Sequence, residues 1–147
     1  MDLKEQIRAD LTTAMREGQT QRRDVLRMVM AAIKQTEVDT RQTLNDEGVQ
    51  DVLRKQLKQR QESIADYTRA GRQNEVEREL AESAIIEGYL PKMMSREEIE
   101  QLARTIVSET GATDSKNIGQ VMSLLMPHVK GRADGRLVNE VVRSLLQ

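Results

Sequence analysis

Three basic side chains gather around one short glycine turn near the end of the chain. Lys130 and Arg132 flank Gly131, and Arg136 follows four residues later. Glycine readily adopts backbone conformations that other residues resist, so Gly131 predicts a sharp turn between two helices. Cations beside the N-terminus of a helix are typical of a phosphate-binding site. The pattern therefore makes this turn a candidate contact for phosphate.

The same turn also has a purely structural interpretation. Asp134 is placed to cap the helix that follows, and its carboxylate would oppose a bound anion. A plain helix connection explains Gly131 and Asp134, but it leaves the three cations without a role. Both interpretations, a phosphate contact and a simple connection, are open from the sequence.

Residues suited to catalysis or metal binding are scarce. His128 is the single histidine, and the absence of cysteine excludes thiol catalysis, disulfides and zinc-thiolate sites. The chain has no phosphate-loop motif, dinucleotide fingerprint or nucleophile elbow. The acidic clusters are interpreted as solvated helix faces and comprise Glu77, Glu79, Glu82, Glu97, Glu98 and Glu100. We therefore expect no catalytic residue, no cofactor and no metal ion.

Helices must position these residues, because the chain has helix-forming composition and sustained apolar periodicity. Phe and Trp are absent and Tyr occurs twice, so aliphatic residues and Met must form the core. Seven helices and no strand are expected, over about 3–17, 20–36, 49–70, 75–90, 96–110, 115–129 and 135 onward. The polar residues 37–48 are interpreted as a mobile loop.

Apolar side chains at helical spacing give each helix an expected buried face. The segment 20–36 has the widest face, which predicts a central helix. Arg60 lies on the apolar face of 49–70, and Asn74 with Glu77 predicts a capped start for the next helix. The expected faces include Met15, Val25, Leu26, Met28, Val29, Ala32, Ile33, Val76, Leu80 and Ala84.

A boundary between two domains is expected at Leu90-Pro91. Proline disfavours helix at the residue before it, and Ser95 with Glu98 then forms a new capping box. The expectation is an all-α protein with an N-terminal helical hairpin bundle over 1–91 and a small three-helix module over 92–147.

Charge is balanced overall but uneven along the chain. The net charge is −1, whereas residues 116–147 hold five basic and two acidic groups, giving +3. A possible second basic surface consists of Arg22, Arg23, Arg27, Arg54, Lys55 and Lys58. The two isolated tyrosines do not favour stacking on unpaired bases. No apolar run suits a membrane span, so a cytoplasmic protein without membrane contact is expected.

One long pattern carries a family resemblance. The chain resembles the YqeY family, whose members are free-standing relatives of the tail domain of the GatB subunit of the tRNA-dependent amidotransferase. The resemblance covers the whole chain. It rests on the segment Gly119 to Gly135, on Arg22 to Val29, on Leu57 to Ser63 and on Tyr89-Leu90-Pro91. The matching motif positions are Gly119, Met122, Met126, Lys130, Gly131, Arg132, Ala133, Asp134 and Gly135.

This GatB/YqeY-domain resemblance implies a tail that helps to hold the tRNA body while a separate domain performs glutamine-dependent amidation. Gly119 is expected to permit close helix packing, and Met122 and Met126 are expected in the core. The leading interpretation is a non-catalytic accessory protein of translation, which binds folded tRNA by phosphates and shape or binds a tRNA-handling protein. A protein–protein interaction module without RNA contact is the second. The third is a carbon–nitrogen ligase with glutamine as amido-N donor, which the missing catalytic residues disfavour.

Overall fold

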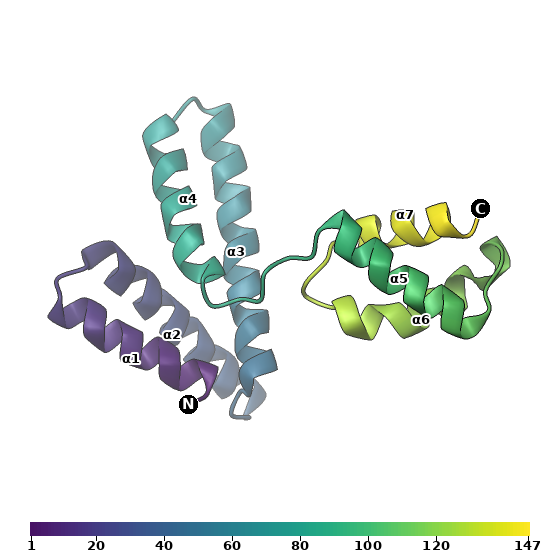
Figure 1. Ribbon diagram of the computed structural model, residues 1–147. Helices are drawn as coiled ribbons and strands as arrows, with labels where there is room; N and C mark the ends of the chain where they lie inside the picture. Colours follow the sequence, from purple (N-terminus) through teal and green to yellow (C-terminus); the bar gives the residue numbers. More distant parts are fainter. The chain divides into compact units, whose positions relative to one another are not determined.

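A computed structural model describes residues 1–147, and all of its regular structure is helical (Figure 1). Seven α-helices and one short 3-10 helix follow one another without a strand, which confirms the all-α expectation. The chain divides into two compact units, Met1–Leu90 and Pro91–Gln147. These are called the N-terminal unit and the C-terminal unit below, and the division falls between Leu90 and Pro91.

The N-terminal unit contains two helical hairpins that share one core. The helices are α1 (Leu3–Arg16), α2 (Thr20–Thr40), α3 (Asp46–Arg69) and α4 (Gln73–Glu87). Figure 1 shows α1 beside α2 and the start of α4 turned back along α3. The buried side chains of the core are Ile7, Val25, Leu26, Val29, Ile33, Val49, Val52, Leu53 and Ile86. Because α2 supplies four of them, it is the central helix that its wide apolar face predicted.

The structure corrects the expected mobile loop at 37–48. Helix α2 continues to Thr40 and α3 begins at Asp46, so only five residues connect them. The Glu37 carboxylate accepts the backbone N–H of Leu44 at 2.8 Å, and Asn45 caps α3 by accepting the N–H of Gly48 at 2.9 Å. Leu44 also packs against the core. The polar residues of this segment therefore bond the connection in place.

The start of α4 also differs from the expected cap at Asn74. The helix begins at Gln73, and its N-cap residue Arg72 makes no side-chain cap hydrogen bond. Gly71, with φ of 71°, reverses the chain directly after α3, and the Arg72 N–H donates to the carbonyl of Tyr67 at 2.9 Å. The tight reversal brings the chain into helical geometry before Asn74, so Asn74 and Glu77 have no capping role.

A buried arginine joins α3 to α4. Arg60 is 6% exposed, and its guanidinium contacts the carboxylates of Glu79, at 3.2 Å, and Glu82. The expectation that these two acids lie on a solvated face is wrong, although Glu77 is exposed as expected. A buried cation requires opposite charge nearby, because an unpaired charge in an apolar environment is very costly.

The Arg60 pairs also explain which face of α4 is buried. Val76, Ser83 and Ile86 are buried and share a face with the two paired acids, whereas Leu80 is 52% exposed. The expected stripe containing Leu80 and Ala84 is therefore wrong, because the helix is rotated to bring its acids to Arg60. Two further expected face residues, Met15 and Met28, are also exposed at the edges of their stripes.

The C-terminal unit is a three-helix module with its own core. Its elements are α5 (Arg96–Thr110), the 3-10 helix η1 (Ser115–Asn117), α6 (Ile118–Val129) and α7 (Gly135–Leu145). Ser95 caps α5 by accepting the N–H of Glu98 at 3.1 Å. The buried side chains are Ile99, Ala103, Ile106, Ala112, Val121, Leu125, Val129, Val138, Val141, Val142 and Leu146. All three α-helices contribute to this core.

Replacing the buried arginine tests its structural role. Arg60→Ala should lower the free energy of unfolding by about 2–3 kcal/mol, because two carboxylates lose their cation while they keep some solvent contact. Lys58→Ala, an exposed change on the same helix, should stay within about 0.5 kcal/mol of the parent. Urea unfolding followed by circular dichroism measures both. Equal effects of the two variants would contradict the assigned role of Arg60.

Candidate functional site

The basic turn, defined as Lys130–Asp134, connects α6 to α7 and is closed by backbone hydrogen bonds. The Lys130 N–H donates to the carbonyl of Met126 at 2.9 Å, and the Arg132 N–H donates to the carbonyl of Val129 at 2.8 Å. Between them Gly131 has φ of 75°, which lies in the left-handed region that favours glycine. The turn is thus a well-defined connection that presents its basic side chains on a fixed backbone.

Arg132 has a structural role that the sequence did not indicate. Its carbonyl accepts the Met94 N–H at 2.6 Å, and its Nε donates to the carbonyl of Lys92 at 3.4 Å. These bonds attach the segment before α5 to the turn within the C-terminal unit. The Arg132 side chain is partly buried, whereas Lys130 and Arg136 are exposed. The two exposed cations are therefore the more accessible groups for an anion.

Asp134 caps α7, as the structural interpretation of the turn predicts. Its carboxylate accepts the backbone N–H of Arg136 at 3.0 Å. The carboxylate therefore occupies the N-terminus of this helix. A carboxylate at this position competes with any anion for the same backbone donors. Phosphate contact at this turn would thus depend on the side chains of Lys130 and Arg136, and the helix end would contribute little.

The remaining motif residues divide into packed and open positions. Met122, Met126 and Ala133 are partly buried and pack against the core of the C-terminal unit. A Cβ atom added to Gly119 or Gly135 would have no atom within 4 Å. The expectation that Gly119 permits close helix packing is therefore wrong, because no neighbouring helix approaches it.

The possible second basic surface is partly neutralised by acidic side chains. Three of its six members have a carboxylate partner: Arg22 with Asp10 at 3.6 Å, Arg23 with Asp24 at 3.0 Å and Arg54 with Asp51 at 2.8 Å. Lys55, Lys58 and Arg27 are exposed, and Arg27 lies 3.4 Å from the sulfur of Met15. The structure thus leaves these three cations as the accessible charge of that surface.

Both tyrosines pack with arginines of the N-terminal unit. Tyr89 donates to Asp10 at 2.6 Å and accepts from Arg22 at 2.9 Å, so it bonds the end of this unit to α1 and α2. Burial, and then the hydrogen bond to the Asp10 carboxylate, raises the pKa of the Tyr89 phenol, which stays neutral. The Tyr67 ring centre lies 5.4 Å from the guanidinium carbon of Arg72.

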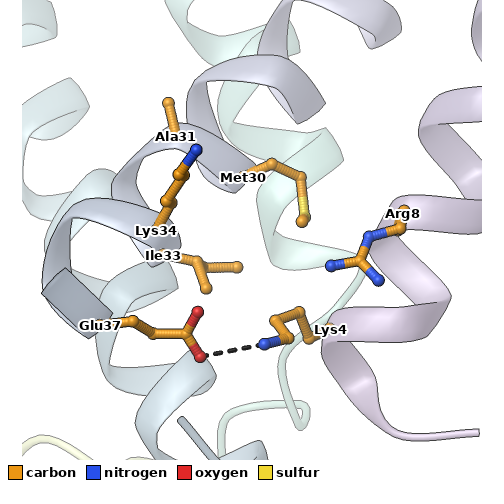
Figure 2. A pocket seen from close by; sticks show the side chains of 7 residues that line it. All are labelled: Lys4, Arg8, Met30, Ala31, Ile33, Lys34 and Glu37. Atoms are coloured by element: carbon orange, nitrogen blue, oxygen red, sulfur yellow. Dashed lines mark hydrogen bonds and ion pairs between the residues drawn. The ribbon is translucent and has the colours of Figure 1, made fainter. Parts of the chain in front are cut away.

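One basic group was not anticipated from the sequence. Lys4 and Arg8 of α1 and Lys34 of α2 line a pocket in the N-terminal unit, together with Glu37 (Figure 2). The spacing of Lys4 and Arg8 places them on one face of a helix, which is a signal the sequence offered. Their meeting with Lys34 depends on how α1 and α2 pack.

The structure contains no cluster of three or more potential metal-ligating side chains among His, Cys, Asp and Glu. The imidazole of His128 lies exposed in the last turn of α6. Every helix falls short of the length or apolar character needed to cross a membrane.

Comparison with known proteins gives one family and several relatives. The family model described as Yqey-like protein matches residues 4–146. Three relatives are named "Altered inheritance of mitochondria protein 41, mitochondrial". The one from Pyrenophora tritici-repentis is 26% identical over 144 residues, covering 95% of this chain and 78% of the relative. The one from Kluyveromyces lactis is 33% identical over 132 residues, covering 87% and 67%. The one from Eremothecium gossypii is 29% identical over 110 residues, covering 73% and 60%. These names state a mitochondrial location and no reaction.

Two glycine substitutions should act in opposite directions on stability. Gly131→Ala should cost about 1–2 kcal/mol, because a Cβ atom is unfavourable at its positive φ. Gly119→Ala should stabilise by up to about 1 kcal/mol, since it lies in a helix with open space around it. Thermal unfolding of both variants measures this difference. A gain of stability in the Gly131 variant would show that the turn does not require glycine.

Proposed function

Because the chain belongs to the Yqey-like protein family, we propose that it is a non-catalytic accessory protein that binds folded tRNA through phosphate groups and shape. The observation that carries the proposal is the exposure of Lys130, on a turn closed by backbone hydrogen bonds, and of Arg136, in the first turn of α7 that follows it. The resemblance of this turn to the amidotransferase tail, which helps to hold tRNA, supports the same partner. If the protein binds phosphates, its affinity for tRNA comes mainly from charge, and this affinity must fall as the salt concentration rises.

Recognition of shape fits this protein better than recognition of unpaired bases. Proteins that bind single strands stack bases mainly on Phe, Tyr or Trp, and the C-terminal unit contains none of these three residues. Structured RNA is bound mainly through its shape, its phosphates and its ribose hydroxyls. We therefore propose a contact with the tRNA body, and we propose no reaction for the chain.

A tRNA-handling protein is the second candidate partner. Large apolar side chains are exposed at Met93, before α5, and at Leu124 on α6. Exposed apolar side chains suit a contact with protein better than a contact with phosphate. In this alternative the family resemblance would reflect a shared protein partner, and the chain would bind no RNA.

The place where the protein works is a separate question. The names of the relatives state a mitochondrial location, which favours a mitochondrial compartment over the cytoplasmic location expected from the sequence. For this chain the cytoplasmic location is an untested prediction, and the names of the relatives do not favour it. Fractionation of cells that express the tagged chain tests it, with recovery in the mitochondrial fraction as the contradicting result.

Removing the two exposed cations tests the tRNA contact. Lys130→Gln/Arg136→Gln should weaken binding to total tRNA and lower the salt slope by up to about two units, one for each lost phosphate contact. Arg132 is left unchanged because its bonds to Lys92 and Met94 hold the turn. Filter binding at several salt concentrations measures both quantities.

A matched control removes the same charge elsewhere in the C-terminal unit. Lys116 and Arg143 are exposed residues outside the basic turn, so Lys116→Gln/Arg143→Gln changes net charge equally. This variant should retain the parent slope. Equal weakening by both double variants would indicate a diffuse charge effect. Unchanged tRNA binding after Lys130→Gln/Arg136→Gln would favour the protein partner.

A further inference from the structure

A pocket of about 470 Å³ lies between α1 and α2, on residues that the basic turn does not include (Figure 2). Lys4 and Arg8 reach it from α1, and Lys34 and Glu37 reach it from α2. The rest of its lining is apolar and consists of Met30, Ala31 and Ile33. The volume lies within the range of pockets that bind small molecules.

One acid and one base of the pocket neutralise each other. The Nζ of Lys4 lies 3.0 Å from a carboxylate oxygen of Glu37, and that carboxylate also accepts the Leu44 N–H. The Leu44 hydrogen bond, and then the contact with Lys4, holds the pKa of Glu37 below its ordinary value. Glu37 is therefore ionised and already hydrogen-bonded, and it is the ion-pair partner of Lys4.

The two other cations keep their charge available to the pocket. The side chains of Arg8 and Lys34 are exposed, and Arg8 acts on the Glu37 carboxylate through its charge, whereas Lys4 contacts that carboxylate directly. The acids near the start of α1 are already engaged, because Asp2 accepts the N–H of Glu5 and Asp46 accepts a backbone N–H of the first turn. The pocket thus has three cations from two helices, Lys4, Arg8 and Lys34, against the single carboxylate of Glu37, which leaves two positive charges in excess.

From this arrangement we infer that the pocket binds the phosphate group of a small phosphorylated molecule. Guanidinium and ammonium groups are favourable donors to phosphate oxygens, and the guanidinium can bind two oxygens at once. A terminal phosphate carries close to two negative charges at neutral pH, which matches Arg8 and Lys34. A phosphodiester of RNA carries one. The apolar wall at Met30 and Ala31 provides contact for the organic part of the ligand.

The inference does not depend on tRNA binding, and phenyl phosphate is a suitable probe. It combines a terminal phosphate with an apolar ring, while benzoate carries the same ring with a single charge. Titration of the full chain, followed by amide chemical shifts at constant ionic strength, should show saturable binding of phenyl phosphate with shifts in α1 and α2. Arg8→Gln/Lys34→Gln should weaken that binding by at least about tenfold. Benzoate should bind the parent more weakly.

The control variant is Arg16→Gln/Arg27→Gln, which removes two exposed charges from the same helices outside the pocket. It should bind phenyl phosphate like the parent. Absence of saturable binding, equal binding of benzoate, or equal losses in both double variants would overturn the inference. Loss of tRNA affinity in Arg8→Gln/Lys34→Gln, with phenyl phosphate binding unchanged, would also overturn it and assign these cations to RNA.

Discussion

The guanidinium of Arg60 lies between α3 and α4 and is surrounded by the carboxylates of Glu79 and Glu82, with the sulfur of Met28 at 3.9 Å. Arginine does not lose its proton in proteins, so its burial requires acids at the same level of the bundle. This requirement fixes the rotation of α4 about its axis. It also explains how a unit without Phe or Trp in its core obtains a specific packing arrangement, because aliphatic side chains alone specify helix rotation weakly.

Local patterns predicted the helices of this fold, and polar contacts between residues of different turns and helices account for two of the features that they missed. Apolar periodicity and the caps at Asp2 and Ser95 correctly indicated all seven helices. The predicted buried face of α4 was wrong because the residue that sets the rotation of this helix, Arg60, lies on α3. The prediction of a mobile loop before α3 was wrong because the Glu37 carboxylate accepts the backbone N–H of Leu44, seven residues further along the chain. Nothing in local sequence reports such partners.

The candidate site shows the same division between local and long-range information. The glycine turn and the Asp134 cap were predicted from their immediate neighbours, and the structure contains both. The attachment of Arg132 to Lys92 spans forty residues, and no local pattern indicates it. The pocket cations come from α1 and α2, so only the packing of these helices brings them together. Each of the two compact units therefore carries its own group of exposed cations.

The two tyrosines give the N-terminal unit a spectroscopic signature of its own. Tyr67 and Tyr89 both belong to that unit, and the C-terminal unit has no Phe, Tyr or Trp. Tyrosine fluorescence and near-ultraviolet dichroism therefore arise from one half of the molecule, while far-ultraviolet dichroism arises from both. The guanidinium of Arg22 lies 5.9 Å from the Tyr89 ring centre, so this signal depends on native contacts. Unfolding of the N-terminal unit can thus be distinguished spectroscopically from unfolding of the C-terminal unit in the intact chain, without a fluorescent label or proteolytic cleavage.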